Sequence, residues 1–396
     1  MKHHIVVLGA GYAGAIAAGR LAKRLHRDDF AITMVNADPD FVERVRMHQL
    51  ATGQELPHRP LRAVYAGSGV QVRTALVTAV DVDRRTVAIT GQNSAETLSY
   101  DTLVYALGST SADHGVPGAA EYAHNIAGKQ AALRLRARLG ELTAGATVLV
   151  AGGGLTAVEA ATEIAEARPD LAVAIAARGG IGSWLHDKAR NHLRVVFDRL
   201  GITVHENADI IGVEADGVAV GDGRRIAADV TVWTAGFTVH SIAAATTLAV
   251  SATGRIVVDA TMRSVSHPDV YAIGDAASAE GAGGAPLRMA CATASPMAWH
   301  AADSLAARLT GGKVPETTIG YATQCISLGR RDGIVQRVTR EDAPTTTVLT
   351  GRFAARVKEF ICAGAAWSTA HPTMLLPSRR RRLAAPDEVE SRLVAS

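Results

Sequence analysis

Two glycine-rich turns, each directly after a short apolar run, constrain the fold of this chain more than any other feature. The first run, Ile5–Leu8, leads into Gly9–Gly14, and the second, Thr147–Ala151, leads into Gly152–Glu159. Such apolar runs are typical of buried parallel strands, and a helix-like stretch of small residues follows the first turn. The sequence therefore predicts two strand–turn–helix units of the same kind in one chain.

The first turn has the pattern G-x-G-x-x-G, which in this context favours a dinucleotide-binding unit over a bland glycine-rich turn. Gly9 permits the tight turn, Gly11 lets the backbone approach a pyrophosphate, and Gly14 lets the helix pack closely on the strand. The N–H groups that open the helix, at Tyr12 and Ala13, are expected to face the phosphates.

The second turn has the related pattern G-x-G-x-x-A, and its third small residue is an alanine. Gly152, Gly154, Leu155 and Thr156 are therefore candidates to hold a second dinucleotide at another helix N-terminus.

The strand that completes each unit ends differently in the two halves. Ala31–Val35 is followed by Asn36, where an acid usually binds the ribose hydroxyls; asparagine can still hydrogen-bond a hydroxyl, without charge assistance. Leu171–Ala176 is followed by Arg178 and no acid, which favours the 2′-phosphate of NADPH over NADH. A solvated loop arginine is the alternative for Arg178.

Each half continues with β-rich segments, predicted as a three-strand meander and a return strand. The predicted strands are 70–72, 79–82, 86–89 and 103–108 in the first half, and 202–204, 210–213, 218–220 and 230–236 in the second. The region after residue 312 is predicted to form strands near 319–328, 333–338 and 346–349, then a helix near 352–363. This repeat indicates an α/β fold with two Rossmann-like dinucleotide-binding domains with β-meanders, plus a smaller α+β C-terminal domain.

Composition excludes several classes of protein. The 396 residues carry a formal net charge of +3, which gives no case for nucleic-acid binding. No apolar run is long enough for a membrane span, and the N-terminus lacks the pattern of a signal peptide. Cys291, Cys325 and Cys362 form neither a disulfide framework nor a metal pattern, so we expect no metal and a cytoplasmic location.

The order of the motifs resembles one family. Besides the glycine turns, the chain contains Tyr105–Gly108, Trp233–Gly236 and Val270–Asp275 in that family's order. Over roughly residues 3–360 it resembles the two-dinucleotide-binding-domain flavoproteins of the pyridine nucleotide-disulfide oxidoreductase superfamily. Within that superfamily it is similar to the type II NADH dehydrogenase and ferroptosis-suppressor-like branch. The redox-active cysteine pair of other branches is absent, because residues 36–60 hold no cysteine.

The resemblance implies a division of the chain between two cofactors. Residues 1–110 and 255–312 would form a discontinuous FAD-binding domain, residues 111–254 a domain for NADP(H) or NAD(H), and residues 313–396 an interface or cap domain with a basic tail. Asp275 would bind the ribityl hydroxyls of FAD, a chemistry that suits a carboxylate; capping of the next helix is the alternative.

The resemblance also implies which residues line the site. The cofactor-binding residues would be Gly9, Gly11, Tyr12, Ala13, Gly14, Asn36, Arg44, Gly108, Gly152, Gly154, Leu155, Thr156, Glu159, Arg178, Gly236, Gly274, Asp275, Met289 and Ala290. The catalytic residues would be Glu159, near the nicotinamide and flavin, together with Arg46 and His48. The alternatives are a surface acid for Glu159, and an amphipathic segment with exposed charges for residues 41–49.

Three further observations concern the acceptor side. The quinone-reducing branch usually carries glutamines after its Gly-Asp motif, but residues 288–297 contain none, so a quinone is only one candidate acceptor. Cys291 has no partner cysteine nearby and is interpreted as a small buried residue rather than a redox group. The basic run Arg379–Arg382 is interpreted as a solvated tail; weak contact with anionic lipid is the alternative.

The sequence thus predicts an FAD-dependent NAD(P)H oxidoreductase that passes a hydride through FAD to a small organic electron acceptor. Hydride transfer between these cofactors needs no acid–base pair from the protein, which agrees with the absence of a recognisable triad. A flavoenzyme with a dedicated substrate and a redox-sensing flavoprotein like apoptosis-inducing factor are the alternatives. We expect no nucleic-acid partner, at most weak peripheral membrane contact, and a possible homodimer.

Overall fold

Two parallel sheets with the same strand order form the framework of the molecule. The computed structural model describes residues 1–92 and 94–384. The first sheet contains, in spatial order, β19 (Val270–Ala272), β7 (Thr102–Tyr105), β1 (His3–Leu8), β2 (Phe30–Asn36) and β3 (Val70–Thr74). The second contains β9 (Ala123–His124), β16 (Val230–Trp233), β10 (Thr147–Ala151), β11 (Ala172–Ala176) and β12 (Thr203–His205). All neighbouring strands in both sheets run parallel, which confirms the predicted α/β class.

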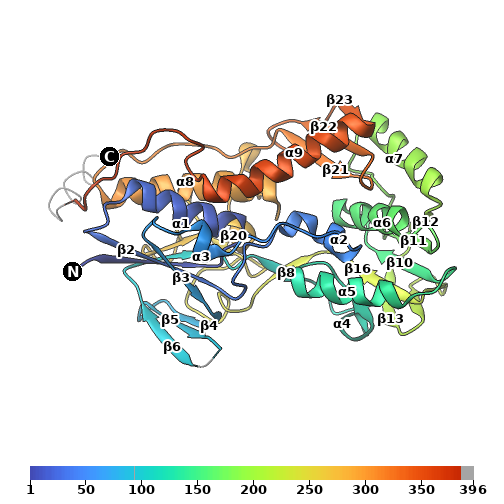
Figure 1. Ribbon diagram of the computed structural model, residues 1–396, viewed down its shortest axis with the longest axis horizontal. Helices are drawn as coiled ribbons and strands as arrows, with labels where there is room; N and C mark the ends of the chain where they lie inside the picture. Colours follow the sequence, from blue (N-terminus) through green and yellow to red (C-terminus); the bar gives the residue numbers. More distant parts are fainter. Residues whose placement is uncertain (93, 385–396) are drawn as a thin grey trace.

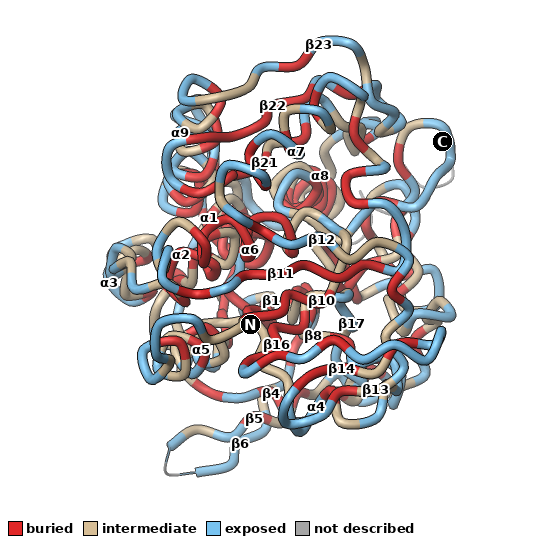
Figure 2. Tube along the Cα trace, turned by 90° about the vertical axis from the view of Figure 1, so that its right-hand side faces the viewer, coloured by how far each residue is buried: buried red, intermediate tan, exposed pale blue. Residues whose placement is uncertain are grey.

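Each central strand is buried because helices and loops cover its sheet. Residues Ile5–Leu8 of β1 and Val148–Ala151 of β10 are 0% exposed, as their apolar runs predict. Figure 2 shows these strands in the interior of the molecule. Helices α1 (Tyr12–Arg24) and α6 (Leu155–Ala167) follow the two glycine turns, so both predicted strand–turn–helix units are present.

The remaining helices surround these sheets and join the two halves. They are α2 (Met47–Ala51), α3 (Leu61–Val64), α4 (Ala119–Tyr122), α5 (Lys129–Glu141), α7 (Asp187–Leu200), α8 (Cys291–Leu309) and α9 (Gly351–Ala370), with the 3-10 turns η1 (Arg44–Arg46), η2 (Gly274–Ala276) and η3 (Ala282–Gly284). Figure 1 shows the first half on the left and the second on the right, with α9 extending along the top towards both. Helix α8 packs on α1, and α2 packs on both α5 and α6.

The meanders differ from the prediction in which strands they contain. The predicted first strand of each meander is an edge strand of a parallel sheet instead, β3 in one half and β12 in the other. The meanders are β4 (Leu76–Asp81), β5 (Thr86–Thr90) and β6 (Ala95–Ser99), and β13 (Ile210–Glu214), β14 (Gly217–Val220) and β15 (Arg225–Ala227). Their third strands were not predicted, because β6 is mostly polar and exposed and β15 has only three residues, too few for an apolar run.

Two short pairings complete the framework. Strand β8 (Ser109–Ser111) pairs antiparallel with β17 (Phe237–Val239), which ties the first half to the second. Strand β18 (Ile256–Val257) pairs parallel with β20 (Ala277–Ser278). The predicted domain boundaries stay predictions.

The C-terminal region forms a three-stranded antiparallel sheet followed by a long helix. The strands are β21 (Thr323–Ser327), β22 (Gly333–Val338) and β23 (Pro344–Thr350), close to the predicted segments. Helix α9 packs on this sheet and on α1, and it runs beyond the predicted end near residue 363. Among the described residues, no helix has the length and apolarity that crossing a membrane would require.

The basic run Arg379–Arg382 is exposed, as predicted, but it also makes contacts with the first half. The backbone of Arg381 pairs with Arg24 and His26 near the end of α1, and Arg382 forms ion pairs with Asp28 and Asp29. The acids on the first half therefore hold residues up to 384 against it. The rest of the predicted tail, including Pro386, lies outside the described residues.

Candidate functional site

The first glycine turn has the shape that a dinucleotide requires. Gly9 has φ +92°, and an added Cβ there would lie 2.3 Å from the Ala106 carbonyl oxygen. A Cβ on Gly14 would lie 2.0 Å from the carbonyl oxygen of Gly9, so close packing of helix on strand needs glycine. A Cβ on Gly11 would meet no atom within 4 Å, so this face of the turn is open.

No side chain caps the N-terminus of α1, so its first N–H groups are available to an anion. Tyr12 and Ala13 contribute only backbone there, because both side chains are buried. Asn36 lies at the end of β2 as expected, but its amide oxygen accepts from the Ala10 N–H at 2.8 Å. Its NH₂ group donates to the Asp38 carbonyl at 2.7 Å, so Asn36 braces the turn itself.

The second glycine turn repeats this geometry. Gly152 has φ +142°, and its added Cβ would lie 2.6 Å from Oγ1 of Thr234, whereas a Cβ on Gly154 would meet nothing within 4 Å. Helix α6 begins at Leu155, beside the half-buried Thr156, with no side-chain cap. At Gly236, φ is +151° and an added Cβ would lie 2.7 Å from Nε2 of His114. Both turns therefore fit the phosphates of a dinucleotide.

Arg178 lies after β11, as predicted, and its side chain is largely exposed. Its Nε lies 3.0 Å from Oδ1 of Asp209. The pairing holds the guanidinium near the end of the strand without burying it, so both the nucleotide role and the solvated alternative stay open.

A half-buried arginine and an aspartate meet beside the first turn. Oδ2 of Asp275 accepts from the Ser109 hydroxyl at 2.6 Å and lies 3.8 Å from Nη1 of Arg44. Asp275 lies inside the 3-10 turn η2, whose N-cap is Ile273, so Asp275 does not cap that turn. Gly274 (φ +67°) and Gly108 (φ +70°) turn the chain on either side of this pair.

Arg44 has a free donor at this point. Its Nη1 donates to the Ser109 carbonyl at 2.7 Å, while its buried Nη2 has no hydrogen-bond partner among the described residues. Burial lowers the pKa of Arg44, and Asp275 partly opposes that effect. A buried, unpaired guanidinium nitrogen fits the anionic diphosphate that the resemblance places near this turn.

Met289 and Ala290 precede α8, which starts at Cys291 without a side-chain cap. Cys291 is exposed, so its interpretation as a small buried residue is wrong. The protein around the Cys291 thiol nevertheless screens it from water, and this desolvation raises the pKa of the thiol, which keeps it protonated. Among the described residues, no group of His, Cys, Asp or Glu could hold a metal ion.

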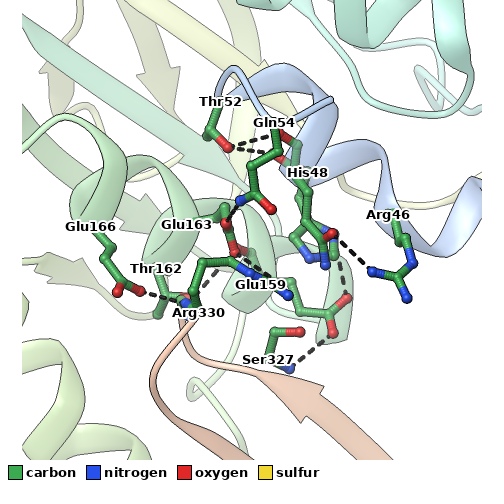
Figure 3. Close-up of polar contacts among 12 residues, drawn as sticks. Arg46, His48, Thr52, Gln54, Glu159, Thr162, Glu163, Glu166, Ser327 and Arg330 are labelled. Carbon is green, nitrogen blue, oxygen red and sulfur yellow. Dashed lines mark hydrogen bonds and ion pairs between the residues drawn. The ribbon is translucent and has the colours of Figure 1, made fainter. Parts of the chain in front are cut away.

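Glu159 is the centre of a buried polar cluster (Figure 3). It is 5% exposed, so the surface-acid alternative is wrong. Its Oε1 accepts from the ammonium of Lys358 and from the Ser327 N–H, the latter at 3.0 Å. Its Oε2 lies 3.9 Å from Nδ1 of His48. Burial by itself raises the pKa of Glu159, but Lys358 outweighs it, with help from His48 and the Ser327 N–H, and lowers the pKa overall.

The segment around η1 and α2 contributes two more buried groups. His48 is 4% exposed, and burial lowers its pKa to about 4, so it is neutral at pH 7. Arg46 binds Glu43 at 2.9 Å and Glu359 of α9 at 2.6 Å. The exposed-segment alternative for residues 41–49 is therefore wrong for both side chains.

The sequence missed several members of this cluster. Lys358 and Ser327 come from α9 and β21, far along the chain from Glu159, and nothing in their local sequence indicates a site. Glu163 and its partner Gln54 were missed too, although Glu163 follows Glu159 by four residues on one helix face, a spacing that could have indicated it.

Comparison with known proteins agrees with this geometry. A model of the pyridine nucleotide-disulphide oxidoreductase family matches residues 3–306. The chain is 28% identical over 332 residues to the NADH dehydrogenase-like protein YutJ of Bacillus subtilis, covering 83% of this chain and 91% of that protein. It is 25% identical over 392 residues to the type II NADH:quinone oxidoreductase of Staphylococcus haemolyticus, covering 91% and 94%.

A solved structure has the same fold. NDH2 from Plasmodium falciparum in complex with NADH superposes with a TM-score of 0.77 at 15% identity, covering 95% of this chain and 97% of that one.

Proposed function

Because the chain belongs to the pyridine nucleotide-disulphide oxidoreductase family and is an FAD-dependent enzyme, we propose that it is an NAD(P)H dehydrogenase that reduces a quinone-type acceptor. Two open glycine turns at uncapped helix N-termini, with the buried ion pair between Glu159 of α6 and Lys358 of α9, are the observation that carries this proposal. When bound, FAD accepts a hydride and gives up two electrons.

The residues of the chain would bind and orient the two nucleotides. The N–H groups at Gly11 and Gly154 would hold the two pyrophosphates. Arg44 would neutralise phosphate charge with its free Nη2, and Asp275 would accept hydrogen bonds from ribityl hydroxyls. These assignments rest on the open turns and the orphaned donor described above.

The buried cluster would control charge and protons beside the reacting rings. Lys358 keeps a carboxylate at Glu159 in a place where burial alone would favour the neutral acid. The uncapped start of α8, at Cys291, would place a helix dipole where it stabilises negative charge on a reduced ring. Fixed charges in a buried site need no reorganisation during the reaction.

The finer nucleotide preference follows from the end of β11. The residues that directly follow β11, Ala177 and Arg178, include no acid, and the exposed Arg178 guanidinium, although it pairs with Asp209, can still reach a 2′-phosphate, so we propose a preference for NADPH. Arg178→Ala should lower kcat/KM for NADPH by about tenfold and leave NADH unaffected, since one charge-assisted hydrogen bond contributes about 1.5–3 kcal/mol. Arg224→Ala, an exposed ion-paired arginine of the same half, is the control.

Anaerobic mixing of the purified protein with each nucleotide tests the proposal. We expect a yellow protein whose flavin absorbance is bleached within seconds by NADPH, more slowly by NADH, and restored by menadione. A colourless protein, or a flavin that neither nucleotide bleaches within minutes, would refute a dehydrogenase function. Rapid bleaching without recovery by any quinone would refute the acceptor class alone.

A further inference from the structure

A second buried carboxyl lies one helical turn beyond Glu159. Glu163 is 1% exposed, and its Oε1 accepts a hydrogen bond from the side-chain amide of Gln54. Its Oε2 is buried and has no hydrogen-bond partner among the described residues. The nearest cation is Arg330, whose Nη1 lies 3.9 Å from this oxygen. Figure 3 shows Glu163 between Arg330 and the side chains of Gln54 and His48.

The groups around Glu163 come from several elements. Its own helix supplies Glu159 on one side and the partly exposed Glu166 on the other. The turn between β21 and β22 supplies Arg330, which is 34% exposed and also binds Glu359 at 3.0 Å. The loop after α2 supplies Gln54.

The other elements packed on α6 add few charges. Helix α2 supplies the neutral His48, and Cys325 is the one titratable residue of β21. Strands β10 and β11 carry no titratable side chain. On α7, His192 and Arg199 face Asp332 instead.

This environment lets Glu163 hold or release a proton near neutral pH. Burial raises its pKa to about 7, with Arg330 and Gln54 opposing the shift and Glu166 and Glu159 adding to it. Arg330 and Glu166 are partly exposed, so protons can arrive from solvent on that side. On the inner side, Glu159 forms an ion pair with Lys358. The charges of these two residues affect the pKa of the Cys291 thiol at the start of α8.

We propose that Glu163 stores the proton consumed when the acceptor is reduced, taking it from solvent beside Arg330 and releasing it inward on the side of Glu159. This inference rests on the proposed function. A hydride from NAD(P)H carries two electrons and one proton, so a quinone needs one more proton to become a quinol. The O–H bond of the Glu163 carboxyl breaks, its electron pair stays on the carboxylate, and a new O–H bond forms on the acceptor. Solvent then reprotonates Glu163.

The first test separates the two half-reactions over a range of pH. In the wild-type protein we expect reoxidation of the reduced flavin by menadione to slow as the pH rises through about 7. Glu163→Gln should abolish this inflection and slow reoxidation at pH 6 at least about tenfold, while flavin reduction by NADPH is unchanged. Glu166→Gln, on the same helix and partly exposed, should keep the inflection but move it to lower pH, because Glu166 helps to raise the pKa of Glu163.

A second variant covers the case in which Glu163→Gln does not fold. Gln54→Leu removes the hydrogen bond that stabilises the Glu163 carboxylate, so the inflection should move to higher pH. A purely structural role of Glu163 would leave the position of the inflection unchanged.

Infrared titration of the purified holoprotein gives a readout independent of turnover. A protonated-carboxyl C=O band should titrate near pH 7, disappear in Glu163→Gln and remain in Glu166→Gln. Normal flavin reduction with a wild-type reoxidation profile in Glu163→Gln would overturn this inference alone, as would the absence of the band. A flavin that neither nucleotide reduces would overturn the proposed function together with this inference.

Discussion

Removing the cation from the buried Glu159–Lys358 pair should be one of the most costly single changes in the molecule. Lys358→Met preserves most of the side-chain volume but leaves the Glu159 carboxylate with the Ser327 N–H and a neutral His48. Glu159 is 5% and Lys358 is 8% exposed, so water cannot replace the lost ammonium. Leaving one member of a buried ion pair uncompensated costs about 3–5 kcal/mol, and we expect a loss of unfolding free energy in this range at pH 7.

The pH dependence of this loss has a definite sign. Lys358 lowers the pKa of Glu159 in the folded protein, so its removal lets burial raise that pKa above the unfolded value. A raised carboxyl pKa favours the native state at low pH and loses that contribution as the pH rises. The cost of Lys358→Met should therefore be smaller at pH 5 than at pH 8.

Guanidinium denaturation of a double-mutant cycle measures the pair directly. Glu159→Gln combined with Lys358→Met removes both charges, so it should be more stable than Lys358→Met alone. A loss under about 1 kcal/mol for Lys358→Met, or a double variant whose loss equals the sum of the two singles, would refute the reasoning.

Three further expectations concern other parts of the structure. Because the pKa of Glu163 is raised from 4.5 to about 7, its carboxyl should reduce the unfolding free energy by about 3 kcal/mol as the pH rises from 4.5 to 7. Glu163→Gln should lose this pH dependence, and denaturation curves that change equally with pH in both proteins would contradict the expectation. Gly14→Ala should destabilise the protein by at least about 1–3 kcal/mol, because its Cβ would overlap the Gly9 carbonyl, whereas Gly11→Ala should lower the bound flavin content without changing the stability of the apoprotein. Arg382→Ala should leave global stability unchanged, because its ion pairs are exposed, but it should speed proteolysis of the tail; an unchanged cleavage rate would contradict the docking of the tail.

The parts of the fold that local sequence determines were predictable. The apolar runs of β1 and β10 specify two strands. The glycine spacing directly after each run specifies the tight turn and the start of the next helix. The meanders were harder, because β6 is mostly polar and exposed, β15 has only three residues, and both are identified only by the neighbours they pair with. Edge strand β3 was misassigned for the related reason that periodicity does not say which sheet a strand joins.

The site divides in the same way. Gly11 and Gly154 would act through their own backbone, so their spacing alone indicated them as candidates. Lys358 lies 199 residues from Glu159, and its function depends on a contact that only the folded chain makes. The same limit explains why the contacts of the basic tail were not predicted, since Arg382 is held by acids at the other end of the chain.

Under the proposed function, the position of Lys358 would give the C-terminal region a part in the chemistry rather than in packing alone. A buried ion pair is a poor source of stability, because desolvation cancels much of the attraction and an apolar pair of the same volume often stabilises as well or better. Around Glu159 the chain nevertheless buries His48, Glu163 and Lys358, taken from α2, α6 and α9. Packing requirements do not account for such a choice, whereas a site that must hold charge and protons beside a reducible ring does. Helix α9 therefore completes the site that the two nucleotide-binding units begin.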